Sequence, residues 1–158
     1  MKQCAACGAK KLVRVVQAAE VRVGRRTFAG DVEARRCSAC GETFTSGEAG
    51  EVLELAAARW LVDNGFSSGE EIRFLRKVAG LRAVDLAELL DVSAEAVSHW
   101  ETGKHHAARG TLATLGALVV DALCGSTATR DRLRALRSPP RLAKVRLDLV
   151  GPVPAANG

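Results

Sequence analysis

The sequence predicts two small domains, a β module built around four cysteines and a helical bundle that follows it, joined by one helix. Three observations predict this arrangement. Two C-x-x-C-G motifs lie near the N-terminus, the apolar pattern changes from strand-like to helical after residue 46, and residues 93–103 read SAEAVSHWETG. At 158 residues the chain suits one ordinary domain or two small ones.

The composition excludes several classes of protein. Apolar residues make up 47% of the chain and aromatic residues only 4%, which favours small cores of Ala, Leu and Val. No run of 18 apolar residues occurs, so no membrane span is expected. The N-terminus, MKQCAACGAK, lacks the apolar stretch of a secretory signal. We therefore expect a cytoplasmic protein, in which paired cysteines are more often metal ligands than disulfides.

The net charge of +5 is concentrated near the N-terminus. Residues 1–46 carry nine Lys or Arg against four Asp or Glu, whereas residues 67–137 carry ten against nine. A basic chain favours a polyanionic partner, although ordinary surface charge for solubility explains the same sum. The near-neutral bundle means that any DNA affinity depends on local clusters of cations or on dimers.

Residues 1–46 are expected to form strands and tight turns. The stretches LVRVV and EVRVG are rich in β-branched residues, and Gly24, Gly30 and Asp31 are expected to punctuate them. Over residues 47–66 the apolar spacing becomes helical, with acids at the start and Gly65 at the end. This segment is expected to be the connecting helix.

Residues 67–137 are expected to form the bundle, with Ser67 or Ser68 capping its first helix. The periodicity places helices at 70–79, 83–90, 93–102, 110–124 and 129–137. Residues 138–158 contain four prolines and are expected to be a flexible tail.

The two C-x-x-C-G motifs predict one metal site, formed by Cys4, Cys7, Cys37 and Cys40. Each motif presents two thiolates, and its glycine permits the positive φ that turns backbone amides towards the sulfurs. Four thiolates suit a structural Zn²⁺ in a closed tetrahedral site, where the metal folds the module and catalyses nothing. A rubredoxin-like iron site and redox-active disulfides are the alternatives. Cys124, in an apolar helix, is expected to be buried and to take no part.

Residues 70–103 predict a helix-turn-helix, in which the second helix of the motif lies in the major groove of DNA. The small Ala87 stands where two helices must cross. The junction between them is expected to be filled by Leu86, Leu90, Val92 and Val97. A generic helical bundle has similar spacing, but the S-x-W-E-x-G ending favours the DNA-binding motif. In that ending Trp100 is expected in the core, and Glu101 is expected to tether its own domain.

The stretch LRKVAGLRAVDLAELLDVSAEAVSHWETGK resembles the Xre family of repressor-type helix-turn-helix domains. Preceded by two C-x-x-C-G motifs, the chain resembles the MqsA antitoxin family with its YgiT-type zinc finger over about residues 1–137. The resemblance implies a Cys₄ zinc-ribbon-like β module and an all-α, repressor-like bundle. It also implies a transcriptional repressor that is the antitoxin of a type II toxin–antitoxin system. The zinc module would bind a ribonuclease-type toxin, and the bundle would dimerise and bind a palindromic operator.

The residues expected to contact DNA are Arg82, Ser93, Ala94, Glu95, Ser98, His99 and Lys104, and the resemblance implies the base contacts of Glu95 and His99. Glu95 and His99 occupy base-contacting positions, where the family prototype carries an amide and a guanidinium. Glu accepts from cytosine N4 and His donates to guanine, so a different operator sequence is expected. Arg82 and Ala83 replace the usual Thr-Gln start of the preceding helix, which exchanges a cap and a neutral phosphate contact for a charged one. His105 and His106 are assigned to the surface.

The helix at 110–124 favours a homodimer formed through the C-terminal domain. Its apolar residues exceed what one small domain needs to bury: Leu112, Leu115, Leu118, Val119, Ala122 and Leu123. A symmetric dimer suits a palindromic operator, and the alternative is that the helix at 129–137 covers this surface.

Two other functions stay open at this point. One is a free-standing Xre-family regulator whose cysteines sense zinc or redox state, and the other is an electron-transfer protein with iron at the cysteines. An enzyme is not expected, because the sequence has no Ser, His and Asp set, no phosphate loop and no open metal position.

Overall fold

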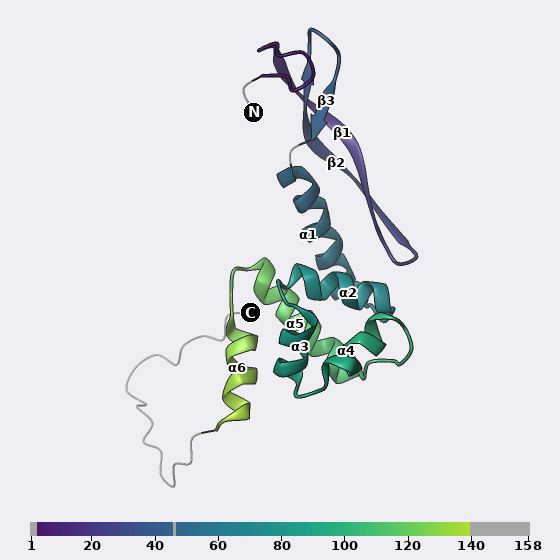
Figure 1. The fold of residues 1–158 in the computed structure, drawn as a ribbon, viewed down its shortest axis with the longest axis vertical. Coiled ribbons are helices and arrows are strands. Elements are labelled where there is room, and N and C mark those ends of the chain that lie inside the picture. Colours follow the sequence, from purple (N-terminus) through teal and green to yellow (C-terminus); the bar gives the residue numbers. More distant parts are fainter. Residues whose placement is uncertain (1–2, 46, 140–158) are drawn as a thin grey trace, which may run out of the picture.

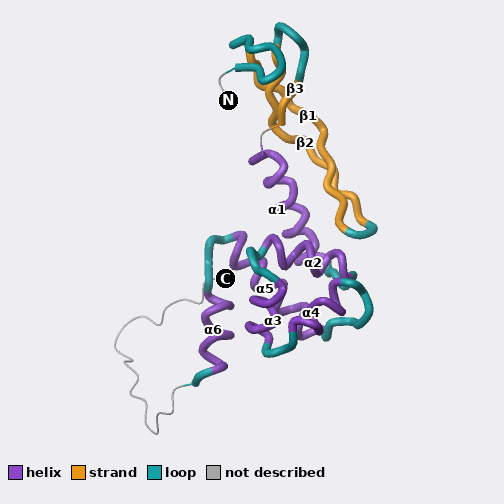
Figure 2. Tube along the Cα trace, in the orientation of Figure 1, coloured by secondary structure: helices purple, strands orange, loops and turns teal. Residues whose placement is uncertain are grey.

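The computed structural model describes residues 3–45 and 47–139. A long β-hairpin and a helix descend from the cysteine-bearing end of the molecule to a bundle of shorter helices (Figure 1). Figure 2 separates the strands of the first part from the helices of the second. The tail predicted at 138–158 lies, from residue 140 on, outside the described residues.

The sheet has three antiparallel strands in the order β1 (Leu12–Val23), β2 (Arg26–Cys37) and β3 (Thr43–Thr45). Strands β1 and β2 pair along their whole length, and a two-residue turn of Gly24 and Arg25 joins them. Gly24 has φ 60°, a conformation that glycine adopts without steric cost and that tight hairpin turns require.

The expected break at Gly30 and Asp31 is wrong, because β2 continues through both residues. The packing around Gly30 gives the physical reason for a glycine inside a strand. A Cβ on Gly30 would lie 3.2 Å from the Leu53 side chain of the overlying helix, so the glycine allows a close approach rather than a turn.

Helix α1 (Gly47–Asn64) packs against the sheet and continues to the bundle. Its buried side chains are mostly small, and Ala57 and Ala58 are 2% and 0% exposed. Leu61, one turn further on, is fully buried in the core of the bundle. The helix therefore joins the hairpin to the bundle by packing as well as by the chain.

The bundle contains five helices among the described residues, close to the expected ranges: α2 (Gly69–Val78), α3 (Ala83–Leu90), α4 (Ala94–Glu101), α5 (Arg109–Leu123) and α6 (Ala128–Arg137). Ser68 caps α2, as expected, because its hydroxyl accepts the Glu71 N–H and the Glu71 carboxylate returns to the Ser68 N–H. Within the described parts of the chain, none of the helices has the length and apolar character of a membrane span.

One apolar cluster joins the hairpin to α1 and the bundle. It includes Leu61, Leu75, Leu86, Val97 and, from the hairpin tip, Val23, which is only 3% exposed. The small antiparallel sheet followed by helices agrees with the predicted fold class. The division into 1–46, 47–66 and 67–137 stays a prediction, and the position of Val23 shows that hairpin and bundle share core residues.

Helix α5 buries its apolar residues within the chain. Leu115, Leu118 and Val119 are at most 3% exposed, while Leu112 and Leu123 pack at the edge of the same core. The apolar residues of α5 that favoured a dimer are therefore largely buried within a single chain.

Cys124 is exposed, so its expected burial is wrong. Helix α5 ends at Leu123, and Cys124 occupies the C-cap position just outside the helix.

Candidate metal centre and nucleic-acid interface

The four cysteines of the two C-x-x-C-G motifs gather at one end of the molecule. Their Sγ atoms all lie within 4.8 Å of one another, with 3.6 Å between Cys4 and Cys40 and 3.7 Å between Cys7 and Cys37. The pairing of β1 with β2 brings the two motifs together. It places Leu12, at the start of β1 and shortly after the first motif, opposite Cys37 in the second motif. Cys4 and Cys37 are buried, whereas Cys7 and Cys40 are exposed.

This geometry fits a metal ion better than disulfides. A tetrahedral ion with Zn–S bonds of about 2.3 Å requires about 3.8 Å between sulfurs. The measured pairs lie close to that length, and a disulfide would bring two sulfurs to about 2.05 Å. The four cysteines can therefore hold one metal ion.

The two glycines close the tight turns of the cysteine motifs. Gly8 and Gly41 have φ 73° and 78°, and the N–H of each donates to the carbonyl of Cys4 or Cys37. Hydrogen bonds from the amides of Cys40 and Ala39 lower the pKa of Cys37 to about 7. This site thus stabilises a thiolate before any metal is considered.

Crowding has the opposite effect on Cys40. The amide of Glu42 lowers the pKa of Cys40, but the Cys7 thiol, burial and the Cys4 thiol together raise it to about 12. Four sulfurs this close do not all ionise alone, since each negative charge opposes the next. A divalent cation at their centre removes that obstacle.

Helices α3 and α4 are joined by a tight turn at the place where the sequence predicts a helix-turn-helix. Asp91 ends α3 in the left-handed conformation (φ 55°), and the Val92 N–H returns to the Ala87 carbonyl at 3.0 Å. The Ser93 hydroxyl then caps α4 by accepting the Ala96 N–H at 3.1 Å. Hydrogen bonds at both helix ends therefore hold this short link.

Helix α4 has one buried side and one exposed side. Val97 is fully buried in the core, and Trp100 packs at its edge, as expected. Among the residues predicted to contact DNA on and just before α4, His99 is half-buried. The others are exposed: Ser93, Ala94, Glu95 and Ser98. The exposed side therefore carries the predicted base contacts.

His99 lies in a small polar network that the sequence did not predict. Its Nε2 atom is 3.1 Å from Lys104 Nζ and 3.5 Å from Glu95 Oε1. The ring of His105 meets the ring of His99 edge-on, with 5.0 Å between centroids. The chain turns back after Gly103, so His105, which was assigned only to the surface, contacts His99 in the last turn of α4.

Arg82, at the N-cap of α3, faces Asp85. Its guanidinium donates to Asp85 Oδ1 at 2.8 Å, and the same carboxylate accepts the Arg82 backbone N–H at 2.8 Å. No side chain caps the first turn of α3, as the loss of the Thr predicts, and Asp85 satisfies only the Arg82 N–H. The Arg82 side chain remains 79% exposed.

A comparison with known families decides which class of protein combines these two features. Residues 1–120 match the family described as "Antitoxin component of bacterial toxin-antitoxin system, MqsA". The chain belongs to the MqsA antitoxin family. The match ends inside α5, so α6 lies beyond the residues that the MqsA family covers. A comparison with curated proteins gave no match. Membership implies an antitoxin role and a toxin as the partner of this MqsA-family chain.

Proposed function

We propose that the chain is the antitoxin of a type II toxin–antitoxin pair and represses transcription by binding duplex DNA. The observation that carries the proposal is the combination, in one MqsA-family chain, of a four-thiol cluster and a capped helix-turn-helix with its polar side exposed. Each feature occurs in other contexts, and the family match supports the two together.

Cys4, Cys7, Cys37 and Cys40 would hold a structural Zn²⁺. The spacing of the sulfurs and the amides around Cys37 support this assignment. When bound, the ion would form four bonds to sulfur that close the cysteine-bearing end of the hairpin. It would not take part in a chemical reaction. The module so formed would bind a ribonuclease-type toxin.

Helix α4 would lie in the major groove of a palindromic operator. Glu95 and His99 would contact base edges, and Ser98 and Lys104 would contact bases or phosphates. Arg82, Ser93 and Ala94 would meet the backbone at the start of α3 and α4. A homodimer formed through the helical part would match the two halves of the palindrome.

Operator binding tests the DNA part of the proposal. The full chain is titrated with the duplex of its own promoter and with an unrelated duplex of the same length. Glu95→Ala with His99→Ala should abolish the preference for the promoter and leave binding to the unrelated duplex unchanged. Arg82→Ala should weaken both duplexes and lower the salt slope by about 1. No difference between the two duplexes for the unaltered chain would contradict the proposal.

Growth rescue tests the antitoxin part. The full chain is expressed together with the product of the neighbouring reading frame, and growth is compared with expression of that product alone. We expect rescue by the unaltered chain and by the Glu95 and His99 double variant, because these two side chains lie on α4 and not in the cysteine-bearing module proposed to bind the toxin. Toxicity that persists in both would contradict the antitoxin role.

A free-standing regulator that senses zinc or oxidants is the second candidate, favoured by the exposure of Cys7 and Cys40. It predicts that mild chelation or peroxide releases the promoter duplex. A structural site predicts promoter affinity that survives both treatments.

A further inference from the structure

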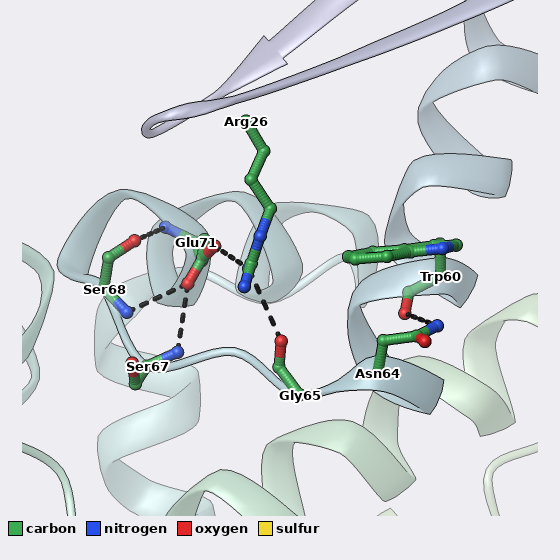
Figure 3. Close-up of polar contacts among 7 residues, drawn as sticks. All are labelled: Arg26, Trp60, Asn64, Gly65, Ser67, Ser68 and Glu71. Atoms are coloured by element: carbon green, nitrogen blue, oxygen red, sulfur yellow. Dashed lines mark hydrogen bonds and ion pairs between the residues drawn. The ribbon is translucent and has the colours of Figure 1, made fainter.

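The tip of the β1–β2 hairpin is attached to the first turn of α2 through Arg26. Nη1 of Arg26 donates to the Glu71 carboxylate and, at 3.4 Å, to the Gly65 carbonyl. The guanidinium lies over the Trp60 ring, 5.5 Å from its centroid. Figure 3 shows Arg26 reaching down from the hairpin between Glu71 and Trp60.

Glu71 is held by backbone amides just before α2 as well as by Arg26. Its side chain is 7% exposed, and its Oε2 accepts the N–H groups of Ser67 and Ser68, each at 3.0 Å. Burial raises the pKa of Glu71, but these amides, the Ser68 hydroxyl and the charge of Arg26 outweigh it and lower the pKa overall. The carboxylate is therefore ionised, and Arg26 forms an ion pair with it.

The backbone of the hairpin tip packs as closely as the Arg26 side chain. Val23 is 3% exposed and belongs to the apolar core of the bundle. A Cβ on Gly24 would lie 3.2 Å from Ser68 Oγ and 3.2 Å from Glu70 Oε2. The hairpin tip thus packs closely against the start of α2. The first turn of α2 cannot shift without disturbing these contacts.

The first turn of α2 in turn rests on the last turn of α4. A Cβ on Gly69 would clash with the Glu101 carbonyl oxygen and would lie 2.7 Å from that of Trp100. The hairpin tip, the start of α2 and the end of α4 also line one open hollow of about 720 Å³. A continuous series of contacts therefore runs from the cysteine-bearing hairpin to the helix predicted to meet DNA.

We propose that Arg26 is a positioning residue for α4, which holds the start of α2, and through it the end of α4, at the angle that operator binding needs. This inference rests on the proposed function, because it requires that α4 meets DNA. Arginine suits this place since its planar group donates to a carboxylate and a carbonyl while its face covers Trp60. A lysine offers one point charge and cannot make the stacked contact in the same way.

A direct phosphate contact by Arg26 is the rival explanation for any loss of affinity. The donors of Arg26 point to Glu71 and Gly65, where the hairpin tip packs against the start of α2. The neighbouring Arg25 is more exposed, at the turn itself, and serves as the matched control for charge.

The test measures Kd for the promoter duplex and for an unrelated duplex, over a range of salt, with the full chain. We expect Arg26→Ala to weaken promoter binding about tenfold, a typical coupling between distant sites, with the salt slope and the unrelated duplex unchanged. Arg26→Lys should recover little of the loss, and Arg25→Ala should leave promoter preference intact. Amide exchange should rise at residues 68–71 and 98–102 in Arg26→Ala.

Three results would overturn the proposal: unchanged promoter affinity in Arg26→Ala, a parallel loss on both duplexes with a lower salt slope, or full recovery by Arg26→Lys. Glu71→Gln keeps the side-chain shape and removes the ion pair, so it supplies the same test if Arg26→Ala does not fold. It should weaken promoter binding in the same selective way, and unchanged affinity would count against positioning. If Glu95→Ala with His99→Ala also leaves promoter preference intact, the proposed function itself fails, which is a distinct outcome.

Discussion

Arg76 and Glu101 form a largely buried ion pair between α2 and the end of α4. Nη2 of Arg76 donates to Glu101 Oε2 at 3.0 Å, and its Nη1 donates to the Leu81 carbonyl at 2.7 Å. Their side chains are 10% and 11% exposed. Glu101 therefore tethers its own domain, as the sequence predicted, and this contact holds the same end of α4 that Gly69 approaches.

Removing one member of this pair should be costly. Arg76→Ala leaves a buried carboxylate and a carbonyl without their donor, which typically costs about 3–5 kcal/mol of unfolding free energy. Arg73→Ala, on the exposed side of the same helix, should change stability by less than about 0.5 kcal/mol. Urea unfolding of both variants checks this, and equal costs at the two positions would contradict it.

Two glycines in helices should respond in opposite directions to alanine. Gly69→Ala forces a Cβ against the Trp100 and Glu101 carbonyls, so we expect a loss of stability and an altered α4. Gly50→Ala meets nothing within 4 Å and should stabilise α1 by up to about 1 kcal/mol. Thermal unfolding of the matched pair measures both effects. A Gly69→Ala protein as stable as the unaltered chain would show that α2 and α4 are less closely packed.

The Arg82–Asp85 contact predicts a specific dependence of stability on pH. Hydrogen bonds from the Arg82 side chain and backbone lower the pKa of Asp85 to about 2. A depressed carboxyl pKa stabilises the folded state above the unfolded value of about 3.9, and this contribution is lost as the pH falls through about 2.

The comparison of the unaltered chain with Asp85→Asn isolates that contribution. Their difference in urea midpoint should be constant above about pH 5 and should shrink towards pH 2. Release of metal by acid occurs in both proteins, so it cancels in the difference. A difference that stays constant from pH 5 to pH 2 would show that Asp85 does not titrate as the contact requires.

Local sequence signals predicted most of the helical part. The apolar spacing of residues 70–137 and the caps at Ser68 and Ser93 correspond to helices within a few residues of the expected ends. The four cysteines were also predictable, because the C-x-x-C-G spacing fixes each pair of sulfurs locally. The helix caps and each C-x-x-C-G pair are local features, whereas the meeting of the two cysteine pairs depends on the pairing of β1 with β2.

The contacts that join hairpin and bundle were not predictable in this way. Arg26 resembles any surface cation in the sequence, and its carboxylate partner Glu71 lies 45 residues further on. Val23 fits an ordinary half-exposed strand, yet it enters the core of the bundle. Gly30 resembles a turn residue in the sequence, because the close approach of α1 that requires a glycine there is visible only in the structure. Only the folded chain brings these residues to their partners.

The metal content of the purified full chain tests the central claim most directly, namely that the four cysteines form one structural metal site at the end of the hairpin. Elemental analysis of untagged protein should find one zinc per chain in the unaltered protein and in Cys124→Ser, and none in Cys37→Ser. An absorption spectrum should show no ferric thiolate bands. Absence of bound metal, the presence of iron, or a Cys37→Ser chain that keeps its zinc would contradict the claim.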